Sequence, residues 1–238
     1  MGEPIGVRYV DVTKTYQQGG QDLSVLRGVS FDVAPGEFIA LMGPSGSGKS
    51  SLLNLTGGLD KATSGRVYVG REEPAMMTEN QLCDWRLRNV GFVFQRYHLL
   101  NVLTAAENIE VPLLLTKLPS AERKRRVRTA LDLVELSARA NSYPKQLSGG
   151  EEQRVAIART IVNDPALILA DEPTGDLDTR SAQSILGLLT LLNQQLKKTI
   201  IMVTHDRTAA SYAHRTMHLQ KGTFSETPPE QAQAHAYP

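Results

Sequence analysis

Apolar and polar residues alternate along the first third of the chain. In 5–13 (IGVRYVDVT) and 26–33 (LRGVSFDV), this alternation predicts half-buried strands. Segment 38–43 (FIALMG) is apolar at nearly every position, so we expect a more deeply buried strand. The pattern becomes helical from Ser50 to Leu59, and 64–70 (SGRVYVG), with glycines around it, predicts a further strand.

The remaining two thirds alternate buried strands with helices. From about Leu103 to Thr160 the pattern is mainly helical and is interrupted by prolines, and a long helix is expected from about Arg180 to Leu196. Three apolar strands with polar ends are expected at 90–95 (VGFVFQ), 166–172 (ALILADE) and 199–206 (TIIMVTHD). This order predicts an α/β fold with a mostly parallel sheet covered on both faces, and the helical middle is expected to be an inserted subdomain.

Composition adds little to this prediction but narrows the classes of function. The chain has 238 residues, 41% hydrophobic and 21% charged, which suits a globular protein of one large or two small domains. The net charge of +1 gives no electrostatic reason to expect nucleic-acid binding. The basic run 122–128 (ERKRRVR) could contact phosphate backbones, but the solvated face of a helix is the favoured interpretation.

Targeting and redox signals are sparse. Cys83 is the single cysteine, so no intrachain disulfide can form. The first ten residues show no signal peptide, and the longest apolar runs fall far short of the roughly 20 residues that span a membrane. If the protein works at a membrane, another chain must cross it. The tail from Ser225 to Pro238 is rich in Pro, Gln and Ala, and we expect it to be disordered.

A phosphate-binding loop follows the apolar strand 38–42. The stretch 43–50 (GPSGSGKS) has the spacing G-x-x-x-x-G-K-S and leads directly into a helix, which is the context that such a loop requires. Backbone N–H groups and the helix N-terminus would surround the phosphates, Lys49 would add a full charge, and the Ser50 hydroxyl would bind Mg²⁺. The predicted nucleotide-contacting residues here are Gly43, Pro44, Ser45, Gly46, Ser47, Gly48, Lys49, Ser50 and Ser51.

Two carboxylates end the strand 167–172 (LILADE). Asp171 is expected to hold Mg²⁺, through water. Because neighbouring side chains on a strand point in opposite directions, Glu172 is free for another role, and we predict that it is the general base for the attacking water. The alternative is simply an acidic start to a loop.

Two other apolar strands end in polar residues, Gln95 and His205. Ligands of parallel-sheet proteins gather outside the carboxyl ends of the strands. We therefore expect Gly43, Gln95, Asp171 and His205 to converge on one site.

A second glycine-containing segment, 147–154 (LSGGEEQR), is called the signature segment below. Its serine and two glycines precede a charged, helix-favouring stretch, so it could be another anion site at a helix N-terminus. A helix start capped by Ser148 is the better interpretation when the other motifs are set aside. The residues alone leave both interpretations open.

Taken together, these motifs resemble those of the ATP-binding cassette (ABC) ATPases, over nearly the whole chain to about Phe224. They occur in the order of that family: Tyr16, the phosphate loop, Gln95, LSGGEEQR, LILADE, GDLD at 175–178, and His205. Within the family, 92–109 (FVFQRYHLLNVLTAAENI) and 170–178 (ADEPTGDLD) are similar to the bacterial lipoprotein-release, macrolide-export and cell-division ATPases.

The resemblance implies a fold and a set of roles. The fold would be a P-loop NTPase with a mostly parallel sheet core, an N-terminal antiparallel β subdomain and a helical subdomain at about 96–160, all within one domain, 1–224. Tyr16 would stack on adenine, Gln95 would contact Mg²⁺ or water, His205 would hold the γ-phosphate, and Asp178 would reach a second copy.

The resemblance also implies a homodimer that encloses two ATP molecules. Ser148, Gly149 and Gly150 would bind the γ-phosphate held by the partner's phosphate loop. Glu151 and Glu152 are then expected to point away from the nucleotide, where carboxylates in a first helical turn gain about 0.3–1 kcal/mol. Relatives more often carry Gln, Arg or Lys at position 152, so Glu152 is a mild departure.

The implied function is an ATP-hydrolysing subunit, with ATP and Mg²⁺, that powers a bacterial membrane transport or force-transmitting complex. It would lie on the cytoplasmic face of the inner membrane and contact integral permease subunits through 95–103 (QRYHLLNVL), without binding nucleic acid. The alternative is a soluble ABC-type ATPase of DNA repair or translation, which usually carries long coiled-coil insertions or two cassettes per chain. Another phosphate-loop enzyme, such as a GTPase, would leave the signature segment unexplained.

Overall fold

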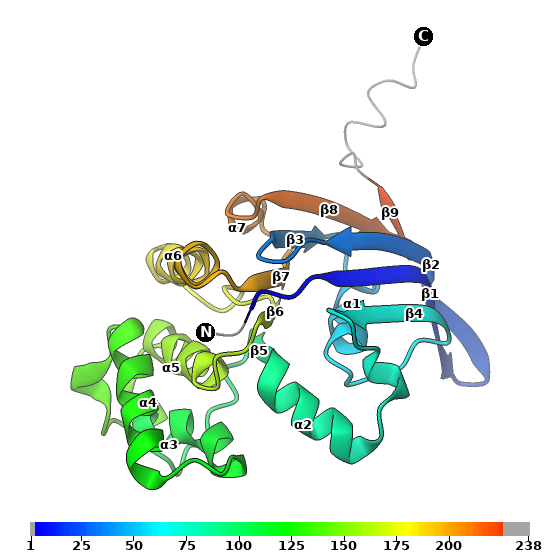
Figure 1. Cartoon of the computed structure of the whole chain (residues 1–238). Coiled ribbons are helices and arrows are strands. Elements are labelled where there is room, and N and C mark those ends of the chain that lie inside the picture. Colours follow the sequence, from blue (N-terminus) through cyan, green and yellow to red (C-terminus); the bar gives the residue numbers. More distant parts are fainter. Residues whose placement is uncertain (1–2, 226–238) are drawn as a thin grey trace.

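A computed structural model describes residues 3–225 and contains two sheets (Figure 1). The smaller sheet is antiparallel, in the order β2-β1-β4, and the larger has six strands in the order β5-β6-β7-β3-β8-β9. The strands are β1 (Val7–Gln18), β2 (Gln21–Val33), β3 (Phe38–Met42), β4 (Ser64–Val69), β5 (Val90–Phe94), β6 (Leu167–Asp171), β7 (Thr199–Val203), β8 (Arg215–Gln220) and β9 (Thr223–Ser225).

The larger sheet is parallel except at one edge. Its neighbouring strands from β5 to β8 run in the same direction, and β9 pairs antiparallel with β8. The predicted fold class, with a parallel core, an N-terminal antiparallel sheet and an inserted helical region, is confirmed.

Strand β3 shows why its sequence is apolar throughout. All five of its residues are buried. Phe38, Ala40 and Met42 belong to one hydrophobic cluster, whereas Ile39 and Leu41 belong to another. Since alternate side chains of a strand face opposite sides, a central strand covered on both faces needs apolar residues at every position.

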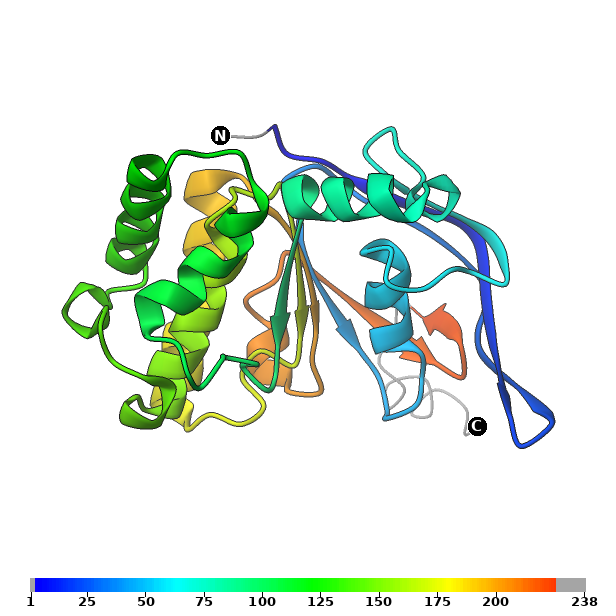
Figure 2. The ribbon, with the colours of Figure 1, turned by 90° about the horizontal axis from the view of Figure 1, so that it is seen from below.

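Helices and the smaller sheet cover the two faces (Figures 1 and 2). One face carries helices α1 and α2 with the antiparallel sheet, and the other carries α6, α5 and the inserted helices. The α-helices are α1 (Lys49–Thr56), α2 (Glu79–Asn89), α3 (Ala105–Glu110), α4 (Ser120–Leu133), α5 (Gly149–Ile161), α6 (Thr179–Leu196) and α7 (Arg207–Ala210). Short 3-10 turns are η1 (Pro74–Met76), η2 (Val111–Leu115), η3 (Ser137–Arg139) and η4 (Pro144–Gln146).

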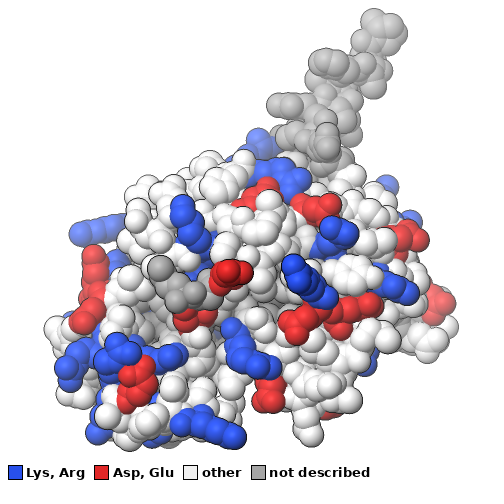
Figure 3. Space-filling model, viewed as in Figure 1, with Lys and Arg blue, Asp and Glu red and all other residues white. Residues whose placement is uncertain are grey.

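The basic run 122–128 lies within α4. Val127 is buried against the neighbouring helices, while Lys124, Arg125 and Arg128 are exposed. Glu122 accepts hydrogen bonds from Arg125 and Arg126, which lower the pKa of its carboxyl to about 2. On the face seen in Figure 3, Lys and Arg lie over the α3–α4 region among acidic side chains. The run is therefore the solvated side of a helix.

Several elements depart from the sequence expectations. Helix α2 was not predicted, because only Leu82 and Trp85 in its eleven residues are buried and its apolar stripe is narrow. Its one sequence signal is the capping box formed by Thr78 and Gln81. The predicted tail begins one residue too early, since Ser225 ends β9, and 226–238 lie outside the described residues. Within 3–225, the helices are all too short or too polar to cross a bilayer.

Candidate active site

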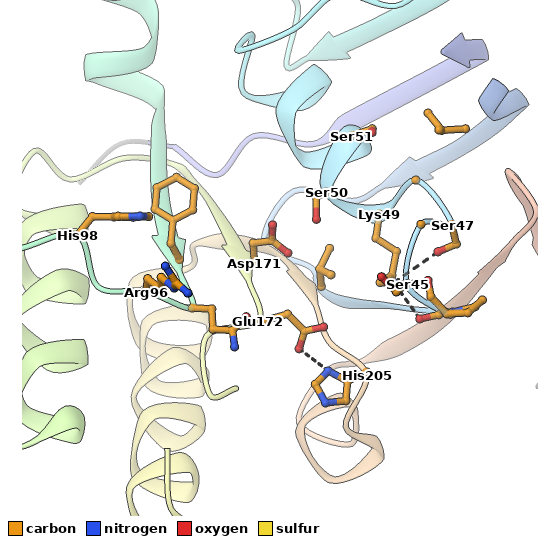
Figure 4. A pocket seen from close by; sticks show the side chains of 18 residues that line it. Ser45, Ser47, Lys49, Ser50, Ser51, Arg96, His98, Asp171, Glu172 and His205 are labelled. Carbon is orange, nitrogen blue, oxygen red and sulfur yellow. Dashed lines mark hydrogen bonds and ion pairs between the residues drawn. The ribbon is translucent and has the colours of Figure 1, made fainter. Parts of the chain in front are cut away.

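A cavity of about 700 Å³ opens at the carboxyl ends of the central strands. The four residues predicted to converge, Gly43, Gln95, Asp171 and His205, all line it (Figure 4). They follow or end β3, β5, β6 and β7 respectively, which are neighbours in the sheet. The parallel order of these strands thus brings residues far apart in sequence to one edge.

The phosphate loop forms one wall of the cavity. All nine predicted residues from Gly43 to Ser51 line it. Gly48 has a φ of 100°, and a Cβ there would lie 2.4 Å from the Val25 carbonyl oxygen, so a side chain is excluded both by conformation and by space. Gly48 is also the N-cap of α1 and makes no side-chain capping bond, which leaves the first N–H groups of this helix available to a ligand.

Lys49 is buried and folded onto its own loop. Its ammonium donates to the carbonyl oxygens of Gly43 (2.8 Å) and Pro44 (2.9 Å). Burial lowers the pKa of Lys49, while the charges of Glu172 and Asp171 oppose that shift. An anionic ligand in the cavity would supply a stronger partner than these carbonyls, because a full negative charge attracts the ammonium more strongly than a neutral carbonyl does.

Asp171 and Ser50 line the same cavity. Burial raises the pKa of the Asp171 carboxyl, the nearby Ser50 hydroxyl and Lys49 oppose this, and the charge of Glu172 adds to it. Oxygen ligands of this kind suit Mg²⁺, which is commonly bound by one or two protein groups plus phosphate and water. In residues 3–225 there is no cluster of three or more His, Cys, Asp or Glu able to hold a metal.

Glu172 does not lie on the strand, contrary to the reasoning from strand alternation. Strand β6 ends at Asp171, and Glu172 has a φ of 50°, in the left-handed region that non-glycine residues rarely adopt. As a result, Asp171 and Glu172 both line the same cavity. Such strained conformations cluster at functional sites.

His205 is paired with Glu172. Its Nδ1 lies 2.9 Å from Glu172 Oε2, and the His205 side chain is 74% exposed whereas that of Glu172 is 20% exposed. The pair places a carboxylate and an imidazole at the rim of the cavity, opposite the phosphate loop (Figure 4).

Gln95 is oriented by a residue that the sequence prediction missed. Its Nε2 donates to Asp176 Oδ1 at 2.8 Å. This bond uses the amide nitrogen and leaves Oε1 as the atom available to a metal or a water. Asp176 and Asp178 are the two carboxylates of the GDLD motif. The sequence predicts a role only for Asp178, which is expected to reach a second copy.

Tyr16 lies beside the cavity rather than in its lining. Its hydroxyl lies 3.2 Å from Ser51 Oγ and donates to Asp60 Oδ2 at 2.8 Å. Because Ser51 does line the cavity, the tyrosine ring borders the phosphate loop. This position is compatible with the predicted stacking on a base.

The signature segment is not part of this cavity. Ser148, Gly150 and Asp178 line a separate hollow of about 340 Å³, and Gly149 lies beside the Tyr97 hydroxyl. Ser148 caps α5 and forms a capping box with Glu151. The capping interpretation is therefore confirmed, and the anion-site interpretation stays a prediction.

The twin glutamates have different environments. Glu151 Oε2 accepts from Ser148 N at 2.8 Å, and its Oε1 lies 3.2 Å from Arg139 Nε. The backbone hydrogen bond at Ser148 lowers the pKa of Glu151, whereas burial raises that of Glu152. Neither lines the main cavity, although Glu151 lines the smaller hollow.

Asp178 caps a helix. It accepts from Arg180 N and Ser181 N, both at 3.0 Å, and from the Ser181 hydroxyl at 2.7 Å. The carboxylate is thereby fixed at the start of α6, beside Ser148 and Gly150. Its predicted reach toward a second copy stays a prediction.

Comparison with known proteins agrees with this geometry. The model of the family described as ABC transporter matches residues 26–175. The ABC ATPase fold and these sites define the class, and the chain belongs to the ABC transporter family. It is an ATPase of the kind that serves membrane transporters, and the alternative role in DNA repair is not supported.

Two curated relatives and one solved structure illustrate the similarity. The lipoprotein-releasing system ATP-binding protein LolD of Saccharophagus degradans is 43% identical over 95% of this chain and 99% of its own length. The macrolide export ATP-binding/permease protein MacB of Brucella melitensis is 42% identical over 93% of this chain, which covers 34% of MacB. A dimeric post-hydrolysis structure of the ATP-binding cassette MJ0796 of Methanocaldococcus jannaschii, bound to ADP and Pi, gives a TM-score of 0.84 at 41% identity, covering 92% of this chain and 98% of that one.

Proposed function

We propose that two copies of this chain bind two ATP molecules between them and that hydrolysis drives a membrane partner. The observation behind this proposal is that the two predicted phosphate-binding segments of one chain lie in separate hollows. The phosphate loop, Asp171, Glu172 and His205 share one cavity, but Ser148 and Gly150 line a different hollow. A γ-phosphate held by Lys49 therefore needs a second copy to meet a signature segment. The dimeric structure of MJ0796 with ADP and Pi supports this arrangement.

In the proposed reaction, a water oxygen attacks the γ-phosphorus and the bond to the β-phosphate oxygen breaks. Glu172 takes the proton of the attacking water, and His205, 2.9 Å away, holds that carboxylate toward the cavity. When both ring nitrogens of His205 carry protons, Nδ1 donates to Glu172 and Nε2 can donate to the γ-phosphate. Lys49 and the α1 N-terminus stabilise the negative charge of the transferred phosphoryl group. Ser50, Asp171 and Gln95 would hold Mg²⁺, which neutralises charge on the phosphate oxygens when bound.

The proposed coupling surface is segment 95–103, which begins at Gln95. Within it, Leu100 is 48% and Val102 82% exposed. In the helical region that follows in the chain, Leu114 and Leu115 of η2 are 60% and 76% exposed. Arg159 of α5 donates to the carbonyl oxygens of Tyr97 (2.8 Å) and His98 (2.7 Å). These two hydrogen bonds connect helix α5, which begins in the signature segment, to the segment that would contact the membrane partner.

The transporter is proposed to be of the lipoprotein-release or macrolide-export type, with this chain at the cytoplasmic face of the inner membrane. The similarity to both relatives supports this type: the chain spans 99% of LolD, a lipoprotein-releasing system ATP-binding protein, and matches 34% of MacB, a macrolide export ATP-binding/permease protein. Isolation of this chain with its co-purifying membrane proteins would identify the permease.

Glu172→Gln tests the proposed base. The amide keeps the size of the side chain but cannot accept the proton, so we expect hydrolysis to fall by about 10²–10⁴-fold while ATP binding persists. The variant should accumulate as a dimer with ATP and revert to monomer with ADP, as measured by size exclusion with light scattering.

Glu79→Gln is the matched control, because Glu79 is exposed in the first turn of α2, away from the cavity. It should behave as the wild type. Hydrolysis at the wild-type rate by Glu172→Gln would show that another group takes the proton.

A further inference from the structure

Lys14 and Asp60 form an ion pair that has no role in the proposed reaction. Both residues contact Tyr16. Lys14 is 9% exposed, and its ammonium lies 2.7 Å from Asp60 Oδ1 and donates to the Lys61 carbonyl oxygen at 2.8 Å. The same nitrogen lies 4.6 Å from the centroid of the Tyr16 ring. Two of its three N–H groups are thus used, and the cation covers one face of the ring.

Asp60 binds Lys14 with one carboxylate oxygen and the Tyr16 hydroxyl with the other. Its Oδ1 also accepts from Lys61 N at 2.7 Å, and its Oδ2 accepts from the Tyr16 hydroxyl. Burial alone would raise the pKa of Asp60, but the hydrogen bonds from Lys14 and Tyr16 lower it below its ordinary value. The carboxylate is therefore charged and fully engaged at neutral pH.

The network joins the antiparallel sheet to the phosphate-binding helix. Lys14 and Tyr16 are alternate residues of β1 and so lie on one side of that strand, while Asp60 follows α1. The Tyr16 hydroxyl also lies 3.2 Å from Ser51 of α1. Side chains of this chain consequently fix the ring relative to the phosphate loop.

We propose that Asp60, held by Lys14, is a positioning residue for the base of the nucleotide. It fixes the Tyr16 hydroxyl so that the ring face not covered by Lys14 is already oriented for stacking. Binding then orders no tyrosine side chain, and preorganisation of this kind increases affinity. The proposal rests on the stacking role proposed for Tyr16, and it assigns Asp60 an effect on the base but none on the phosphates.

Asp60→Asn, which keeps the shape of the side chain, is the principal test. Dissociation constants for ATP and for inorganic tripolyphosphate, each with Mg²⁺, are measured by calorimetry. We expect the variant to bind ATP about threefold to tenfold more weakly, the cost of ordering one side chain, with tripolyphosphate unchanged. Asp32→Asn is the matched control in the same sheet, because its ion pair with Arg8 is exposed at 67% and 71%, and it should change neither constant.

A double-mutant cycle shows whether Asp60 acts through the hydroxyl. Tyr16→Phe removes only that hydroxyl and should weaken ATP binding to a similar extent, and the double variant should lose no more than either single one. Losses that multiply, unchanged ATP binding, or an equal loss of tripolyphosphate binding would each overturn the assignment. Failure of the wild type to bind tripolyphosphate would instead refute the proposed phosphate site, so the two failures are distinguishable.

Discussion

The starts of helices α1 and α5 differ although both carry glycines and serines. The N-cap of α1 is Gly48, with no side-chain capping bond, no acidic residue in its first turn and Lys49 as its first residue. The N-cap of α5 is Ser148, closed by a capping box, with Glu151 and Glu152 in the first turn. One helix start is open and positively charged, and the other is capped and negatively charged.

This difference indicates the order in which the two starts bind phosphate. At α1 the free N–H groups and Lys49 favour an anion with no partner present. At α5 the carboxylates oppose a free anion, even though Glu151 is occupied by Ser148 N and Arg139. We infer that α1 captures the nucleotide and that α5 engages only a phosphate already neutralised in part by the other copy.

Lys49→Ala removes the charge that distinguishes α1, and we expect the largest effect from it. Hydrogen bonds to charged groups are worth about 1.5–3 kcal/mol, so ATP affinity should fall by about tenfold to 150-fold, with hydrolysis lost as well. Lys145→Ala, at an exposed lysine just before the signature segment, is the control for a charge change. Unchanged ATP binding by Lys49→Ala, measured by calorimetry, would remove the distinction between the two helix starts.

Ser148→Arg acts on α5 alone. The bulky cation fills the hollow beside Gly150 and Asp178, so ATP-dependent dimerisation should be lost. Removing an oxyanion donor typically costs about 10²-fold in rate, and we expect hydrolysis to fall by at least that much with monomeric ATP binding unchanged. If the variant still dimerises with ATP, as judged by light scattering, the signature segment is not at the interface.

The core of the fold and its main cavity were predictable from sequence because they depend on strong local patterns. Continuous apolar runs give the central strands, and parallel order then places Gln95 and His205 at one edge. The elements missed lack such patterns. Helix α2 buries two side chains, and β8 has only Leu219 fully buried.

Tertiary contacts explain the remaining differences at the site. Asp60 and Asp176 act through Tyr16 and Gln95, which are 44 and 81 positions away in sequence, so no local motif marks them. The contact between Lys14 and Tyr16 was weakly indicated by sequence, because residues two apart on one strand lie on the same side of it. The left-handed backbone of Glu172 could not be predicted from the motif LILADE, because its apolar run leads directly into the two carboxylates.

The twin glutamates provide the smallest and most selective test of the comparison. Burial raises the pKa of Glu152 above its ordinary value of 4.5. The charged carboxylate therefore lowers the free energy of unfolding at pH values above the raised pKa, and this effect is absent below pH 4.5, where the group is protonated in both states. Glu152→Gln should therefore increase the free energy of unfolding at pH 7 by about 0.5 kcal/mol or less, and the gain should vanish as the pH falls to 4.5. Glu151 has its pKa lowered, so it contributes stability above pH 4.5 that is lost as the pH falls through its folded pKa. Glu151→Gln should therefore lower the free energy of unfolding at pH 7. Urea unfolding at the two pH values measures both variants.

Hydrolysis by Glu152→Gln should stay within about twofold of the wild type, as for other surface changes. A larger change in rate would show that Glu152 acts on the nucleotide or the dimer, and the negative charge of α5 would then be part of the mechanism rather than a property of its cap.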